Sequence, residues 1–304
     1  MLEPREAIDR ISAVYRGPHP GSRALHAKGS FHTGTFTASA DAAALCRAAP
    51  FQGDPVPVLV RWSNASGHPR SRDTSQDVRG MAVSFRPDLA TAAGAFDLLG
   101  QTAPRFPVRI PEAFVAFTEA VAKPATLPLF LARNPAAGVA LLANARARST
   151  APPRSFAEAT YFPIHAYGWT SPDGDRSWVR FTLAPLGGAA DRPEGTYEGR
   201  DRLHEEIRAR LAEGPVRFDL RVTVAAPGDD PDDPMSVWKG ARELSAGVLE
   251  VTAEDPARET GGDIVVFDPT RVVDGIELSD DPVLRYRPSA YSVSIERRSH
   301  PQDP

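Results

Sequence analysis

Strand-like segments near both ends of the chain enclose a helical middle, and this order restricts the folds available to it. Residues 21–110 and 160–270 contain short apolar or alternating runs bounded by Gly and Pro, which predict strands. Residues 111–150 and 199–213 carry apolar side chains at helical spacing. Strands that bracket a helical middle suit an antiparallel barrel with helices packed outside it. We therefore predict an α+β fold with an antiparallel β-barrel core and surrounding helices.

One predicted strand shows the pattern clearly. Residues 56–63 alternate along the chain, so Trp62 faces one side of the sheet while Arg61 and Ser63 face the other. Residues 24–39 form a second predicted strand, rich in Phe, Thr and small side chains. Both segments are long enough to belong to a sheet with a buried face.

The length and apolar content allow a substantial core. The chain has 304 residues, of which 41% are hydrophobic. We find no internal repeat and no linker between independent units, so we assign residues 1–304 to one domain. Residues 1–20 are predicted to form an N-terminal helix and a connector rich in Pro and Gly.

Charge and cysteine content exclude several classes of function. The net charge of −4 argues against a partner that is a nucleic acid or an anionic membrane. The single cysteine, Cys46, cannot form an intrachain disulfide. The N-terminal segment lacks an apolar signal-peptide core, and no apolar run reaches the length of a membrane span. We expect a cytoplasmic protein.

Two short polar segments lie at opposite ends of the chain. His26 belongs to the predicted strand 24–39, and by itself it could be an ordinary core or surface histidine. Arg287, Tyr291 and Arg298 lie at positions i, i+4 and i+11, which share one face of a predicted helix over residues 287–298. That helix alone could equally be a solvated surface helix. Four further histidines lack the spacing of metal ligands and receive no predicted role (His32, His68, His165 and His204).

In context, these segments resemble those of catalases. Residues 23–29 (RALHAKG) resemble the segment that carries the catalase histidine, and residues 60–63, 73–85 and 96–100 resemble the catalase segments that follow, in the same order. The Arg-x-x-x-Tyr pattern of residues 287–298 resembles the catalase proximal helix, which supplies the iron ligand. The chain thus resembles the short catalase-related haem peroxidases, and the resemblance implies a catalase-type barrel with a C-terminal proximal haem helix.

The resemblance implies roles on the distal side of a haem. His26 would act as acid and base toward peroxide, because a neutral imidazole can take a proton from one oxygen and return it to the other. Ser63 would orient the imidazole. Gln101 stands where catalases carry an asparagine that contacts peroxide. Ala65 and Asp77 match residues of the access channel, and Ala65 is smaller than the usual valine.

The resemblance also implies how haem b would be held. Tyr291 would be the metal ligand, and a guanidinium beside it, from Arg287, would favour its phenolate form. Guanidinium groups match carboxylates in geometry, so three other arginines would bind the propionates. Two aromatic side chains would lie near the distal face of the haem. These further cofactor-binding residues are Arg23, Arg61, Arg298, Phe106 and Phe114.

The implied activity is reduction of hydrogen peroxide or organic hydroperoxides by an organic electron donor, through a ferryl intermediate. Gln101 and Ala65 depart from the catalase pattern, so catalase activity is expected to be weak. Two alternatives stay open: an organic or fatty-acid hydroperoxide isomerase or lyase on the same scaffold, and a non-enzymatic haem-binding stress protein. A smaller assembly, a homodimer or a monomer, is a further expectation, because the parts of long catalases that build the interlocked tetramer have no counterpart here.

Overall fold

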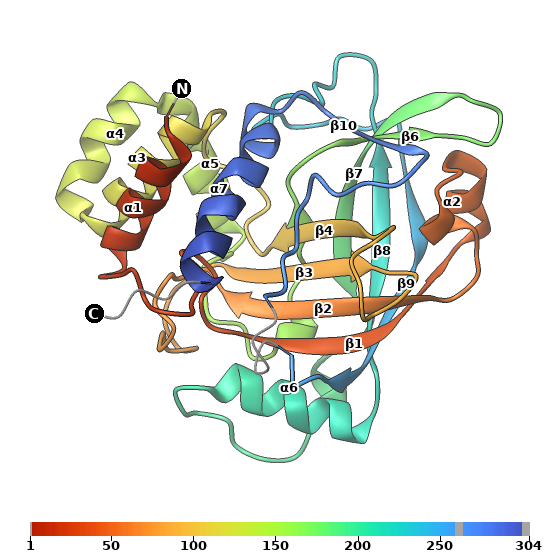
Figure 1. Ribbon diagram of the computed structural model, residues 1–304, viewed down its shortest axis with the longest axis horizontal. Coiled ribbons are helices and arrows are strands. Elements are labelled where there is room, and N and C mark those ends of the chain that lie inside the picture. Colours follow the sequence, from red (N-terminus) through yellow and green to blue (C-terminus); the bar gives the residue numbers. More distant parts are fainter. Residues whose placement is uncertain (1, 259–263, 300–304) are drawn as a thin grey trace.

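The computed structural model describes residues 2–258 and 264–299. Within them, ten strands form one antiparallel sheet in the order β10-β6-β7-β8-β9-β1-β2-β3-β4-β5 (Figure 1). The strands are β1 (Gly29–Ala38), β2 (Val56–Asn64), β3 (Arg79–Phe85), β4 (Phe96–Gln101), β5 (Phe162–Pro163), β6 (Tyr167–Thr170), β7 (Arg176–Pro185), β8 (Val216–Val224), β9 (Arg242–Glu254) and β10 (Ile276–Leu278).

The sheet curls until its two ends approach each other. β4 pairs with β5, and an isolated bridge joins Tyr161, just before β5, to Leu183 of β7. The strands from β7 round to β5 therefore enclose a core of aromatic and branched side chains, among them Phe36, Phe85 and Phe218. The predicted α+β fold with an antiparallel barrel core is confirmed.

Strand β2 separates this core from the site. Val60 and Trp62 are buried in the barrel core, whereas Arg61 and Ser63 project to the other face, as the alternation predicts. A bulge between Thr33 and Gly34 of β1 shifts its register against β9. The alternating side chains of β2 thus serve packing on one face and polar contacts on the other.

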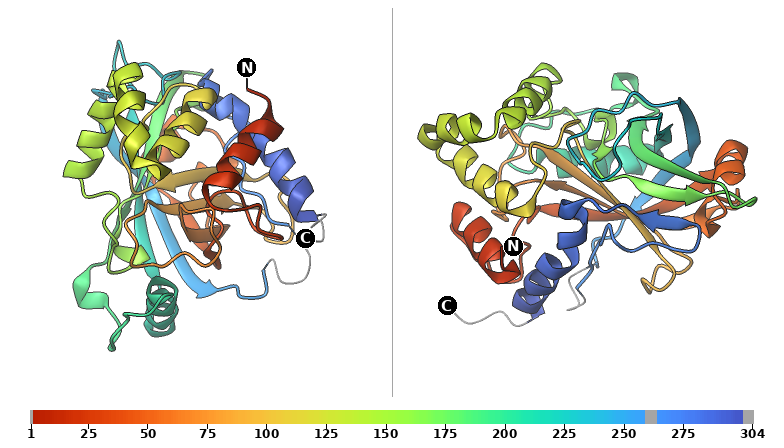
Figure 2. Two further views of the ribbon diagram at one scale, coloured as in Figure 1. Left: turned by 90° about the vertical axis from the view of Figure 1, so that its left-hand side faces the viewer. Right: turned by 90° about the horizontal axis from the view of Figure 1, so that it is seen from above.

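Seven α-helices occur in the described residues. Four of them, α1, α3, α4 and α5, gather at one end of the molecule, and α7 lies between them and the sheet (Figures 1 and 2). None of the described helices has the length and apolar character needed to cross a membrane. The helices are α1 (Pro4–Val14), α2 (Ala40–Leu45), α3 (Pro111–Ala122), α4 (Leu127–Arg133), α5 (Pro135–Arg146), α6 (Arg202–Glu213) and α7 (Pro282–Ser299), and the 3₁₀ turns span Ala49–Phe51, Pro124–Thr126, Phe156–Glu158 and Ala189–Asp191.

Two strand predictions, from residue 21 onward and over residues 24–39, begin too early. β1 begins only at Gly29, and His26 has φ +54°, a left-handed conformation that no strand residue adopts. The backbone N–H of His26 donates to the carbonyl of Ala65, 3.0 Å away. A turn, and not a strand, therefore presents the His26 side chain.

Other boundaries differ too. The helix predicted over 199–213 starts at Arg202, and residues 264–270 at the end of the predicted strand region contain no strand, while residues 259–263 lie outside the described part of the chain. The three-residue strand β10 was not predicted. The periodicity of apolar residues cannot show whether an extended segment has a partner strand. It also cannot distinguish a three-residue strand from a loop.

Helix α7 starts well before the predicted residue 287. The Asp281 carboxylate accepts from the backbone N–H of Val283 at 2.8 Å, and a proline occupies the first helical position, which is a normal helix start. Pro288 was predicted to lie in the first turn, but it lies inside the helix. Its ring nitrogen donates no bond to the carbonyl one turn earlier, and the helix nevertheless continues to Ser299.

Candidate active site

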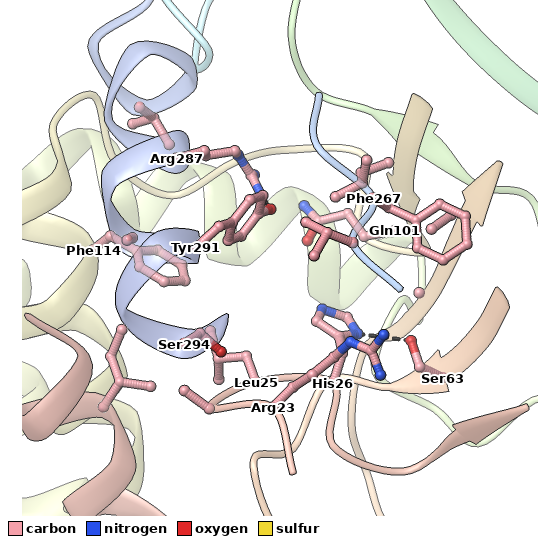
Figure 3. Close-up of a pocket in the computed structure, with 18 of the residues that line it drawn as sticks. Arg23, Leu25, His26, Ser63, Gln101, Phe114, Phe267, Arg287, Tyr291 and Ser294 are labelled. Atoms are coloured by element: carbon pink, nitrogen blue, oxygen red, sulfur yellow. Dashed lines mark hydrogen bonds between the residues drawn. The ribbon is translucent and has the colours of Figure 1, made fainter. Parts of the chain in front are cut away.

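A cavity of about 280 Å³ lies between α7, helices α1 and α3, and strands β2 to β4 (Figure 3). Its walls are mostly apolar, with a small number of polar side chains, as is usual for a ligand site. Every site residue predicted from the sequence lines it, namely Arg23, His26, Arg61, Ser63, Gln101, Phe106, Phe114, Arg287, Tyr291 and Arg298.

His26 and Ser63 form a hydrogen-bonded pair on one wall. The Nδ1 atom of His26 lies 2.9 Å from Oγ of Ser63 (Figure 3). Gly80 on β3 leaves the space for this pair, because a Cβ there would come within 2.7 Å of the imidazole and 2.8 Å of the Ser63 hydroxyl. The turn before β1, the end of β2 and the start of β3 together fix the position of the ring.

The imidazole of His26 is held in its neutral form. Burial, followed by the positive charges of Arg61, Arg287 and Arg23, lowers the pKa of His26 to about 3. At neutral pH the ring therefore carries one proton and one lone pair. Such a ring can accept a proton from a ligand in the cavity.

Tyr291 faces the same cavity from α7. Its hydroxyl oxygen accepts a hydrogen bond of 2.9 Å from Nη1 of Arg287, one helical turn earlier (Figure 3). Burial opposes the charge of Arg287, but Tyr291 and Asp281 outweigh burial and raise the pKa of the guanidinium. The phenol oxygen therefore has a permanent cation beside it.

Behind Arg287 lies a pair of buried residues that the sequence did not reveal. Nε of Arg287 donates to Nε2 of His165 over 3.0 Å, and Nδ1 of His165 lies 2.6 Å from Oδ2 of Asp281. Burial lowers the pKa of His165 to about 4, so the ring is neutral, with its proton on Nδ1 and its lone pair on Nε2. Asp281, His165, Arg287 and Tyr291 thus form one chain of hydrogen bonds.

Arginines supply the charge of the cavity. The guanidinium groups of Arg23 and Arg61 lie 5.7 and 5.5 Å from the ring centre of Phe31, and Arg298 approaches the cavity from the end of α7. With Arg287, four arginines line the cavity, and none of its described lining residues is acidic. The cavity therefore selects for an anionic ligand with a large apolar body.

Gln101 and two phenylalanines complete the walls. Phe106 and Phe114 stack with ring centres 5.5 Å apart. The Gln101 side chain lines the cavity, but its Nε2 donates to the carbonyl of Ala103 at 3.3 Å. The amide is thus engaged with backbone and is not held against His26 by any hydrogen bond among the described residues.

The two predicted channel residues are not among the residues that line this cavity. The carboxylate of Asp77 accepts from the backbone N–H of Ser66 at 3.0 Å, and burial raises the pKa of Asp77. Ala65 contributes its carbonyl to the turn that presents His26. Both residues support the loop beside the site.

This donor set fits a haem. A porphyrin has a large apolar surface and two carboxylates, which match apolar walls with four arginines and no acid. The Tyr291 oxygen, bonded to the Arg287 cation, is a suitable anionic ligand for ferric iron. The neutral ring of His26 projects toward the cavity from the opposite wall (Figure 3).

Comparison with solved structures first defines the class of fold. The chain matches a bacterial catalase with a TM-score of 0.75 and 21% identity, over 98% of this chain and 61% of that catalase, so it spans less than two thirds of its length. The catalase family model matches residues 2–195. Among curated proteins, a catalase-related peroxidase of Mycolicibacterium paratuberculosis is 42% identical, and the match covers 98% of this chain and 95% of that protein. A catalase-related peroxidase of Synechococcus elongatus is 28% identical, and the match covers 98% of this chain and 89% of that protein. The chain belongs to the catalase family, as the sequence resemblance predicts.

Proposed function

We propose that this protein is a haem b peroxidase that reduces hydrogen peroxide or organic hydroperoxides with an organic electron donor. The observation that carries the proposal is the placement of neutral His26 and Arg-bonded Tyr291 on opposing walls of one cationic cavity. The similarity to two catalase-related peroxidases supports the same activity.

Five residues would hold the haem. Tyr291 would ligate the iron, and Arg287 would stabilise the phenolate. Arg23, Arg61 and Arg298 would bind the propionates, because guanidinium pairs with carboxylate in two-point geometry. When bound, the haem would supply the redox-active iron at which the peroxide O–O bond is cleaved.

His26 would move the proton of the peroxide. In the tautomer whose Nδ1–H donates to Ser63 Oγ, the lone pair of Nε2 can accept the proton of one peroxide oxygen and deliver it to the other, which leaves as water or alcohol. Ser63 would orient the ring and favour this tautomer. The low pKa of His26 keeps the base form available across the physiological range.

The buried pair behind α7 would keep Arg287 in place. The Asp281 carboxylate orients His165, and neutral His165 accepts from Arg287 Nε, so the Nη1 group of Arg287 remains directed at Tyr291. The bond between Asp281 and His165 is buried, which strengthens it relative to the same bond in water.

A second candidate is rearrangement of an organic or fatty-acid hydroperoxide. Apolar side chains of α1 and α3 favour it, since Ile8, Ile11 and Val115 line the cavity. Parallel assays with hydrogen peroxide, cumene hydroperoxide and a fatty-acid hydroperoxide distinguish the two. Products without consumption of a donor would favour rearrangement.

The experiment that tests the proposal is the absorption spectrum and peroxide reaction of the haemin-reconstituted protein and of His26→Ala. We expect a ferric Soret band in both, and a fall of about 10²-fold or more in the reaction rate of the variant. A matched control exists, because His204 Nδ1 also bonds a serine, Ser30, at 3.0 Å, but outside the cavity. Ser63→Ala should slow the reaction, whereas Ser30→Ala should not. Haem retention without any peroxide reaction in the parent protein would instead favour a haem-binding stress protein.

A further inference from the structure

The end of the molecule farthest from the barrel has an exposed apolar surface. We define the α4–α5 lobe as residues 121–148, which include α4, α5 and the end of α3 (Figures 1 and 2). Apolar side chains of this lobe are 50% to 72% exposed, whereas most large apolar residues elsewhere in the described chain are buried. They are Val121, Leu129, Val139 and Leu142.

The lobe and the residues that directly follow it carry only positive charges. Residues 121–157 contain five arginines and lysines and no aspartate or glutamate, in a chain whose net charge is −4. Screening in salt limits the reach of a charge to about 8 Å, so a local cluster, and not the total charge, determines what a surface attracts. The net charge, from which we predicted no anionic membrane partner, therefore does not describe this lobe.

The cations of the lobe form no ion pairs within the described residues. Several exposed arginines elsewhere do pair with carboxylates, such as Arg5 with Glu296 and Arg176 with Glu277. In the described part of the chain, no ion pair involves the four exposed cations of the lobe, which are Lys123, Arg133, Arg146 and Arg148.

Each helix carries an exposed leucine and, four positions later, an exposed arginine. Leu129 and Arg133 on α4, and Leu142 and Arg146 on α5, are each separated by four residues and therefore share a helix face. An arginine in this position can extend its aliphatic stem along an apolar layer and place its guanidinium at the level of phosphate groups. This pattern is typical of helices that lie at a lipid interface.

We infer that the α4–α5 lobe docks on an anionic lipid surface, with its leucines and valines in the acyl boundary and its cations at the headgroups. The charge of the lobe is complementary to such a surface. A second copy of the chain would bring two sets of unneutralised cations together, and a nucleic acid would leave the apolar side chains without a partner. The inference does not depend on the proposed chemistry of the cavity.

Co-sedimentation with vesicles tests the inference without any activity measurement. We expect the folded protein to bind vesicles that contain phosphatidylglycerol and not vesicles of phosphatidylcholine alone, and added salt should weaken the binding. Each cation contributes about fivefold to such binding, so Arg133→Gln with Arg146→Gln should weaken it by tenfold or more.

Matched controls distinguish the lobe from the rest of the surface. Arg70 and Arg72 are also exposed, and no described ion pair involves them, so Arg70→Gln with Arg72→Gln makes the same change in charge and should leave binding intact. Leu129→Gln with Leu142→Gln should weaken binding, whereas Leu186→Gln, at a site that is 53% exposed, should not.

Three outcomes would overturn the inference. The first is a lack of binding to anionic vesicles by a protein whose circular dichroism shows the native fold. The second is an equal loss of binding in the lobe and control variants. The third is sedimentation equilibrium in which the leucine substitutions convert a dimer into a monomer, since the lobe would then be an interface between copies of the chain.

Discussion

Nη1 of Arg287 lies 2.9 Å from the hydroxyl oxygen of Tyr291, one turn further along the same helix. Because both residues belong to α7 and are four positions apart, the geometry of the helix keeps their side chains neighbours on one face. The cation and the oxygen that it stabilises therefore enter the cavity as one unit.

Removing the phenol oxygen should abolish the iron ligand. We expect Tyr291→Phe to lose the ferric Soret band of the parent, or to shift it strongly, because the oxygen bonded to the Arg287 cation would be gone. Tyr286→Phe is the matched control, since Tyr286 lines the cavity from the same helix but donates to the Leu2 carbonyl. Identical spectra of the two variants would contradict the assignment of Tyr291.

Removing the imidazole behind Arg287 should destabilise the fold. His165→Ala leaves the Nε donor of Arg287 and the Asp281 carboxylate without their buried partner. We expect the free energy of unfolding in urea to fall by about 2–5 kcal/mol. A loss below about 0.5 kcal/mol would mean that water replaces the imidazole at no cost.

The reaction with peroxide should be insensitive to pH over a wide range. The pKa of His26 is lowered to about 3, mainly by burial, so the base form predominates above that pH and is lost only as pH falls through it. Stopped-flow rates should be flat between about pH 8 and 5 while the protein stays folded. A midpoint near about 6.5, the value of free histidine, would show that the pKa of His26 is not lowered in the active protein.

Stability should fall in mild acid. Burial lowers the pKa values of His32 and His204 to about 4 in the folded chain, against about 6.5 in the unfolded chain. Between these values the unfolded chain binds protons that the folded chain does not, so each histidine removes up to about 1.4 kcal/mol per pH unit as pH falls. Urea unfolding over this window measures the slope, and His32→Phe should reduce it. An unchanged slope in that variant would refute the contribution of His32.

A single methyl group at Gly80 should disturb the site. The Cβ of Gly80→Ala would press on the His26 ring and on the Ser63 hydroxyl, so we expect a loss of peroxide reactivity of about 10²-fold with the Soret band retained. Gly138→Ala on α5, whose nearest new contact is 4.0 Å away, should leave reactivity unchanged and stabilise the helix by about 0.5–1 kcal/mol. Equal activities of the two variants would contradict the packing described around His26.

Sequence reasoning identified the residues that line the cavity better than the residues that hold them in place. His26, Tyr291 and the arginines lie in contiguous motifs, and a motif is visible whatever the fold does around it. His165 and Asp281 are separated by 116 positions and meet only because the loop after β5 and the start of α7 pack together. No spacing rule links two such residues, so their pairing could not be predicted.

The errors in secondary structure have a related cause. The apolar pattern near His26 suggests a strand, but hydrogen bonding to Ala65 holds the residue in a left-handed turn. Pro288 seemed to mark a helix start, whereas the stronger signal, Asp281 followed by a proline, lay one and a half turns earlier. A tertiary contact decided the first case and a local capping signal the second, and the periodicity of apolar residues reports neither.

The packing of α1 against α7 has a consequence for how the protein is made. The wall that carries Ile8 and Ile11 leaves the ribosome well before the wall that carries Tyr291. A nascent chain that has already folded its barrel would possess His26 but lack the residue proposed to ligate iron. Capture of the cofactor would then have to wait until α7 is synthesised, and a chain truncated before α7 would lack the proposed iron ligand.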